Sequence, residues 1–140
     1  MKNKNIWKEI EKPLGYFKDN RGEIVDVFYK KDINHVAVIK SEPNILRGNH
    51  YHKESTQHML ITKGSLEYWY KPLNSTKLAS VVTLREGDFV STPPGEVHAL
   101  VIGPNGNEFI VFTEGIRGGC DYESDTYRVD NIVPLENTPG

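Results

Sequence analysis

Short runs rich in β-branched and aromatic residues recur along almost the whole chain, and this pattern constrains the fold more than any other feature. Gly, Pro, Asn and Asp separate the runs at close intervals, which is typical of a small antiparallel sandwich or barrel. A turn or two of helix is expected only at residues 6–12, and the lack of a long helical period argues against a βαβ architecture. The runs are EIVDVFY, HVAVIK, HMLITKG, SLEYWYK, ASVVTL, DFVST, HALVIG, EFIVFTE and YRVDNIV. The sequence therefore predicts an all-β fold, with turns at KGS and GPNGN among others.

The size and charge of the chain limit its partners. Its 140 residues hold no internal linker or repeat, so a single domain spanning residues 1–140 is expected. The 17 basic and 19 acidic residues form no run of one sign, which argues against nucleic-acid and membrane partners. No apolar run approaches the roughly 20 residues of a membrane span, and the charged start lacks a signal-peptide core. A single cysteine, Cys120, excludes an internal disulfide and fits a reducing compartment, so we expect a cytoplasmic protein.

Three of the five histidines lie in the stretch RGNHYHKESTQHM. Because side chains alternate along a strand, His50 and His52 should face the same side. In the strand that follows, Gln57 is expected to face the core. His58 should then face outward as a solvated or interface histidine.

A tight Pro-Pro-Gly turn precedes His98 and should hold it in a fixed position at the start of the next strand. A barrel can bring His98 against His50 and His52. Three imidazoles and one side-chain oxygen, here from Gln57, are ligands suited to Zn, Fe, Ni or Mn. The sequence thus predicts a divalent metal site at these four residues.

The spacing of these residues resembles the two sequence motifs of the cupin superfamily. Two positions depart from the pattern: Gln57 stands where the family usually has a glutamate ligand, and Ile102 where it often has asparagine. The resemblance implies a double-stranded β-helix, the cupin jelly-roll barrel. The first motif is matched by His50, His52, Gln57 and Gly64, and the second by Gly87, Pro93, Gly95 and His98.

The glutamine alters the expected metal chemistry. A glutamate would cancel one unit of a metal ion's charge, whereas Gln57 offers only a neutral carbonyl oxygen. We therefore expect a more weakly bound and more electrophilic ion, which favours an anionic ligand or a developing enolate oxygen in its open position. The alternative is a metal-free site in which Gln57 forms hydrogen bonds with the histidines.

Further segments resemble the RmlC-like, nucleotide-sugar branch of the cupins, namely FKDNRGE, RGNH and YESDTYRVDN. That branch includes dTDP-4-dehydrorhamnose 3,5-epimerases, dTDP-4-keto-6-deoxyhexose 3,4-ketoisomerases and cupin domains of capsule-synthesis enzymes. The resemblance implies a homodimer with a nucleotide-sugar substrate. It places His50 at the position of a general base, and Arg21 and Arg47 where arginines approach the nucleotide pyrophosphate. A guanidinium suits this role because its fork of N–H donors matches phosphate oxygens.

The implied reaction is proton abstraction beside the ketone of a 4-keto-6-deoxy sugar, as in an epimerase or ketoisomerase of surface-polysaccharide biosynthesis. A histidine has a suitable pKa, and a metal ion or a hydroxyl from Tyr68 or Tyr70 could hold the enolate oxygen. His50 cannot ligate a metal and act as a free base in the same complex. Either a metal-free site uses His50, or a metal is bound and another base acts, for which His35 is a candidate. The intact second motif favours the metal.

Two other functions fit the same ligands. An Fe- or Ni-dependent cupin dioxygenase uses histidines and an oxygen donor in the same way. A non-catalytic sugar-binding cupin would capture a ligand without turnover.

Overall fold

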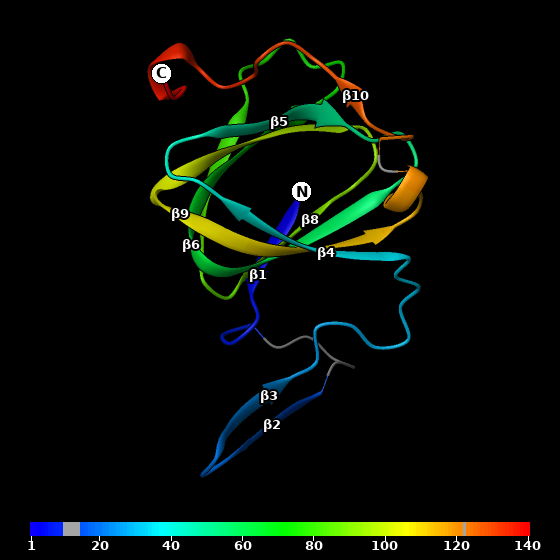
Figure 1. The fold of residues 1–140 in the computed structure, drawn as a ribbon, viewed down its shortest axis with the longest axis vertical. Helices are drawn as coiled ribbons and strands as arrows, with labels where there is room; N and C mark the ends of the chain where they lie inside the picture. The colour runs from blue at the N-terminus through cyan, green and yellow to red at the C-terminus, as the bar shows by residue number, and fades with distance from the viewer. Residues whose placement is uncertain (10–14, 122) are drawn as a thin grey trace.

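The computed structural model describes residues 1–9, 15–121 and 123–140, and this part of the chain is mostly β-strand (Figure 1). Two short 3-10 helices, η1 (Gly119–Asp121) and η2 (Leu135–Asn137), lie near the C-terminus. The all-β prediction is confirmed. The strands are β1 (Lys2–Asn5), β2 (Tyr16–Asp19), β3 (Gly22–Val25), β4 (His35–Ser41), β5 (Leu46–Tyr51), β6 (Thr56–Pro72), β7 (Ser80–Arg85), β8 (Asp88–Thr92), β9 (Glu96–Glu114) and β10 (Tyr127–Arg128).

Two long antiparallel strands, β6 and β9, pair along most of their length and belong to both sheets of a jelly-roll barrel. At one end, β6 also pairs with β8, β8 pairs with β1, and β9 pairs with β4. At the other end, β6 pairs with β7, β9 with β5, and β5 with β10. The two ends therefore form two sheets that face each other across one core, as Figure 1 shows.

The turns expected at residues 63–65 and 103–107 are wrong, because β6 and β9 continue through both segments. The pairing register shifts on either side of Gly64, which has a φ of 73°. A Cβ on Gly64 would lie 2.3 Å from the carbonyl oxygen of Gly106, so glycine is required for this close approach. These glycines bend the strand pair from one sheet into the other and do not end it.

The ends of the chain also differ from the strand pattern. The last predicted strand, YRVDNIV, shortens to Tyr127–Arg128. Of the helix expected at residues 6–12, residues 6–9 belong to a turn in which the N–H groups of Lys8 and Glu9 bond the carbonyl of Asn5. Residues 10–12 lie outside the described residues. β2 and β3 form a separate hairpin that extends away from the barrel (Figure 1).

Apolar side chains fill the barrel and leave one end of it to polar groups. A smaller cluster of Trp69, Ala99 and Val133 shows that the C-terminal segment packs on the outer face of β6 and β9. Among the described residues, no helix is long and apolar enough to cross a membrane. The main core consists of Met59, Ile61, Leu66, Tyr68, Leu84, Val90, Leu100, Ile102, Phe109 and Val111.

Candidate active site

A local irregularity in β5 positions the first histidines. The register between β5 and β9 shifts between Gly48 and His50, and Asn49 between them has a φ of 58°. The Asn49 side chain stabilises this conformation, because its Oδ1 accepts the N–H of Ile132 at 3.0 Å. A Cβ on Gly48 would lie 2.9 Å from the His98 carbonyl oxygen, so glycine is needed there. His50 consequently lies opposite His98 on the neighbouring strand.

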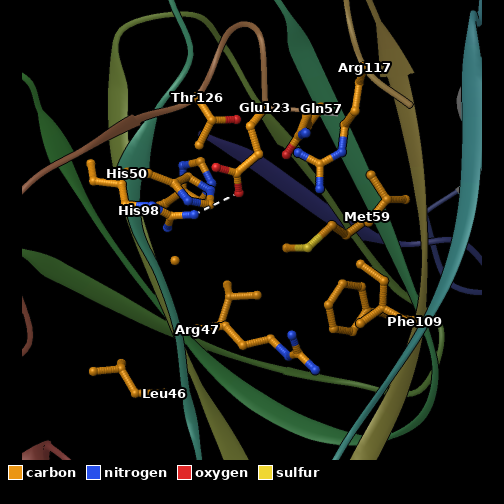
Figure 2. Close-up of a pocket in the computed structure, with 15 residues that line it drawn as sticks. Leu46, Arg47, His50, Gln57, Met59, His98, Phe109, Arg117, Glu123 and Thr126 are labelled. Carbon is orange, nitrogen blue, oxygen red and sulfur yellow. Dashed lines mark hydrogen bonds and ion pairs between the residues drawn. The ribbon is translucent and has the colours of Figure 1, made fainter. Parts of the chain in front are cut away.

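His50, His52 and His98 converge inside the barrel. Each contributes one nitrogen, and these nitrogens all lie within 4.8 Å of one another. The centroid of the His50 ring lies 5.1 Å from that of His52 and 4.7 Å from that of His98. His52 and His98 are only 2% and 5% exposed. Figure 2 shows His50 and His98 side by side at the edge of a cavity.

The environment keeps all three imidazoles neutral. The pKa of His50 is lowered to about 3, mainly by burial and in part by the nearby His98 and His52. The pKa of His98 is lowered to about 4, mainly by burial and in part by His52. The pKa of His52 is lowered by burial, although its hydrogen bond to the Asp125 carbonyl opposes this. The neutral imidazole is the form that ligates a metal ion.

Hydrogen bonds set the orientation of two of the rings. Nδ1 of His52 lies 2.8 Å from the Asp125 carbonyl oxygen, and Nδ1 of His98 lies 3.2 Å from that of Glu96. A carbonyl only accepts hydrogen bonds, so both Nδ1 atoms carry hydrogen and both Nε2 atoms keep a lone pair. Nε2 of His52 is buried and has no hydrogen-bond partner among the described residues.

Gln57 completes a set of donors that fits a divalent cation. It is 8% exposed and lines the same cavity as His50 and His98. Its amide Nε2 is also buried and lacks a hydrogen-bond partner within the part of the chain that the structure describes. Three neutral imidazoles, an amide oxygen and an unsatisfied buried ring nitrogen suit a metal such as Zn, Fe, Ni or Mn.

A cavity of about 380 Å³ opens beside the histidines. Arg47 reaches into it from β5, and its guanidinium donates to the Ser41 hydroxyl at 2.8 Å and to the Lys40 carbonyl at 3.2 Å. The cavity is lined by Ile39, Leu46, Arg47, Gly48, His50, Gln57, Met59, His98, Leu100, Phe109, Val111, Arg117, Glu123, Thr126 and Arg128.

Four of these residues, all after β9, were missed by the sequence analysis: Arg117, Glu123, Thr126 and Arg128. Nη2 of Arg128 donates to Oε1 of Glu123 at 2.6 Å. Figure 2 shows the guanidinium groups of Arg117 and Arg47 entering the cavity from different sides. The segment YESDTYRVDN pointed to three of the four only as part of a family pattern. Arg117, in the sequence GIRGG, carried no signal.

Residues 17–114, more than two thirds of the chain, match the family described as the polysaccharide biosynthesis C-terminal domain. The chain belongs to this family. A curated relative is the UDP-2-acetamido-2,6-beta-L-arabino-hexul-4-ose reductase of Pseudomonas aeruginosa PA103, with 27% identity over 83 residues. The match covers 59% of this chain but only 22% of the reductase. The four cavity residues after β9 lie beyond the segment that matches the family.

Solved structures of sugar-nucleotide isomerases share the fold. The 3,4-ketoisomerase QdtA of Thermoanaerobacterium thermosaccharolyticum, solved with TDP, has a TM-score of 0.66 and 19% identity, covering 84% of this chain and 85% of its own. The dTDP-4-dehydrorhamnose 3,5-epimerase of Sulfolobus tokodaii has a TM-score of 0.66 and 18% identity, covering 88% of this chain and 79% of its own. The predicted fold, a cupin-type jelly-roll barrel, is confirmed.

Arg21, predicted to bind the substrate, and His35, a candidate for the base, both lie away from the cavity. Arg21 is in the β2–β3 hairpin, where its 80% exposed side chain bonds Asp19 at 2.6 Å. His35 begins β4, and its Nδ1 lies 3.5 Å from the Thr113 hydroxyl. Neither residue is among the described residues that line the cavity.

The two tyrosines considered as hydroxyl donors pack in the core. Tyr68 is fully buried, and its hydroxyl contacts Thr92 and donates to Glu96 at 3.2 Å. Its ring stacks on His98 with a centroid distance of 6.0 Å. Tyr70 packs beside Tyr68, and neither tyrosine is among the described cavity-lining residues. Burial raises the pKa of Tyr68, so its hydroxyl stays protonated.

The expectation that His58 is solvated or at an interface is wrong. It is 7% exposed, with Nδ1 at 2.7 Å from the Ser91 hydroxyl and Nε2 at 2.6 Å from a Glu114 carboxylate oxygen. Its ring also packs against Phe28 at 5.1 Å. The segment between β3 and β4 places Phe28 over the outer face of the sheet, where it shields His58 from solvent. A strand pattern alone does not predict that a loop packs there.

Proposed function

We propose that the protein is a metal-dependent epimerase or ketoisomerase acting on a nucleotide-linked 4-keto-6-deoxy sugar in surface-polysaccharide biosynthesis. The observation that carries this proposal is the convergence of His50, His52 and His98, all neutral, on a cavity lined by arginines. Membership of a polysaccharide-biosynthesis family supports it. The ketoisomerase and epimerase with the same fold are named for reactions of such sugars.

The arginines supply the positive charge that a nucleotide pyrophosphate needs. Arg47, Arg117 and Arg128 all line the cavity, and guanidinium groups bind phosphate oxygens through paired N–H donors. Nη2 of Arg128 donates to the Glu123 carboxylate. A phosphate that engages Arg128 would release the Glu123 carboxylate into the cavity.

His50, His52, His98 and the Gln57 oxygen would hold the divalent cation. When bound, the cation supplies Lewis-acid polarisation of the sugar ketone, which acidifies the neighbouring C–H. The pKa of about 3 makes His50 a weak base at neutral pH, which favours its role as a ligand. Glu123 is then the cavity carboxylate placed to remove the proton. The charge of Arg117, which acts on all three histidines, is positioned to stabilise the enolate.

Solvent deuterium exchange tests this proposal. Incubation with a panel of 4-keto-6-deoxy nucleotide sugars in heavy water should incorporate deuterium at the carbon beside the ketone, detected by mass spectrometry. Chelation should abolish exchange, and Glu123→Gln should slow it about a hundredfold or more. Glu136→Gln, at an exposed position in η2, is the matched control and should exchange at the wild-type rate.

Each alternative function gives its own result. Binding of a nucleotide sugar without any exchange would contradict isomerisation and favour the sugar-binding cupin. Oxygen consumption by the Fe- or Ni-loaded protein would favour the dioxygenase. Exchange that persists after complete chelation would favour the metal-free site with His50 as the base.

A homodimer is part of the proposal. Phe17 and Ile24 in the projecting hairpin are 54% and 62% exposed, and Val36 and Val38 on β4 are 57% and 61% exposed. Phe17 and Ile24 pair across the hairpin, and Val36 and Val38 lie on one face of β4; exposed apolar pairs of this kind are typical of a protein interface. Light scattering should give twice 15.9 kDa for the wild type, and Val38→Glu should shift the mass to that of a monomer. A wild-type monomer at micromolar concentration would contradict the dimer.

A further inference from the structure

Asp125 is a buried acidic residue, 5% exposed, in the segment that returns over the barrel after β9. Its carboxylate accepts three consecutive backbone N–H groups: Oδ1 accepts from Lys53 at 2.9 Å, and Oδ2 from Glu54 at 2.9 Å and Ser55 at 2.8 Å. Its own carbonyl accepts Nδ1–H of His52 at 2.8 Å. One residue therefore binds four successive positions of the chain, beginning at a candidate metal ligand.

These contacts determine which nitrogen of His52 faces the other histidines. The Asp125 carbonyl requires the hydrogen on Nδ1, which leaves the lone pair on the buried Nε2. The carboxylate fixes the turn that directly follows His52, and a negative charge suits three converging N–H dipoles. An asparagine could accept from fewer of these N–H groups, because its NH₂ group is a donor.

The same anchor fixes the wall of the cavity. Asp125 lies between Glu123 and Thr126, which both line the cavity. Two residues further on, Tyr127 stacks on Tyr51 with a centroid distance of 5.4 Å. Asp125 thus joins the segment after β9, which lies beyond the family match, to the segment that carries His52.

We infer that Asp125 is a positioning residue that holds His52 in its Nδ1–H tautomer and ties the cavity wall to the histidine site. The inference rests on the proposed function for the chemistry that it serves. Asp125 contacts no substrate in this role and acts through His52.

The test compares Asp125→Asn with Asp130→Asn, an exposed aspartate on the same segment. In the metal-free wild type and the control, ¹⁵N NMR of the imidazoles should show His52 protonated at Nδ1 and not at Nε2. Asp125→Asn should give a mixture of tautomers. Its affinity for Co²⁺ should fall by about tenfold to a hundredfold, as for other groups that orient metal ligands.

Retention of the Nδ1–H tautomer in Asp125→Asn, with Co²⁺ affinity within twofold of the control, would overturn the inference. Finding Nε2–H at His52 in the metal-free wild type would overturn it even if the variant does not fold. The tautomer is measured without substrate or metal. A protein that shows the expected tautomers but no deuterium exchange would therefore contradict the proposed function alone.

Discussion

His50 and His98 stay neutral at pH values where an exposed histidine takes up a proton. Burial is the main cause, and the crowding of the three rings adds to it. A neutral cluster binds a cation without first losing protons, but it also makes the fold sensitive to acid. The same property that suits these residues to a metal therefore has a cost in stability.

This cost can be measured as the pH dependence of the unfolding free energy. The unfolded chain protonates its histidines as the pH falls below about 6.5. Folded His50 and His98 resist protonation down to pH values of about 3 and 4, so acid favours the unfolded state. The unfolding free energy of the metal-free protein should fall by about 2 kcal/mol per histidine between pH 7 and pH 5. Urea titrations at both pH values measure it.

His98→Asn is the control for that experiment, since it removes one titrating group. Its unfolding free energy should lose about 2 kcal/mol less than the wild type over the same pH range. An identical pH dependence in the two proteins would contradict the assignment of a lowered pKa to His98.

Part of the site could be predicted from local spacing. The four proposed ligands lie in two short motifs, where strand alternation and a Pro-Pro-Gly turn determine which way their side chains point. Arg117 and Glu123 could not be predicted in this way, because their place depends on how the chain returns across the barrel. Arg21 shows the reverse case: its motif is present, but the hairpin carries it away from its own chain's cavity, and its role in substrate binding stays a prediction.

At the level of strands, β6 and β9 are each long enough to belong to two sheets. Glycine-rich segments can end a strand or bend it, and local sequence does not distinguish the two cases. Pairing between Gly64 and Asn107 continues through the bend, which is a long-range contact. The predicted apolar runs coincide with the pairing segments of β4, β6, β7, β8 and β9, whereas β1 and β2 lie outside the predicted runs.

Two glycine substitutions separate the cost of a left-handed backbone from the cost of a steric clash with a neighbouring strand. Gly64 and Gly95 have φ values of 73° and 80°, but a Cβ at Gly95 would meet nothing within 4 Å. Gly95→Ala should therefore cost roughly 1–2 kcal/mol for the left-handed backbone alone. Gly64→Ala should cost about 3 kcal/mol or more, because it also clashes with the backbone of Gly106. Urea unfolding measures both, and equal losses would contradict the account of the bend.

Over the whole molecule, the barrel provides a rigid frame and the segment after β9 completes the cavity. The barrel could be predicted from many short strands and the cupin motifs. The path of the C-terminal segment could not, because it depends on packing of Val133 against Trp69 and on the Asp125 anchor. The expected single domain and cytoplasmic location remain predictions.

Cobalt titration of the metal-free protein, followed by visible absorption, is the decisive test of a metal centre at the three histidines. We expect saturation at one Co²⁺ per chain and loss of binding in His98→Asn. Gln57→Glu should bind about tenfold more tightly, since an anionic ligand cancels one unit of the metal's charge. No saturable binding, or binding that His98→Asn leaves unchanged, would contradict a metal centre at the three histidines.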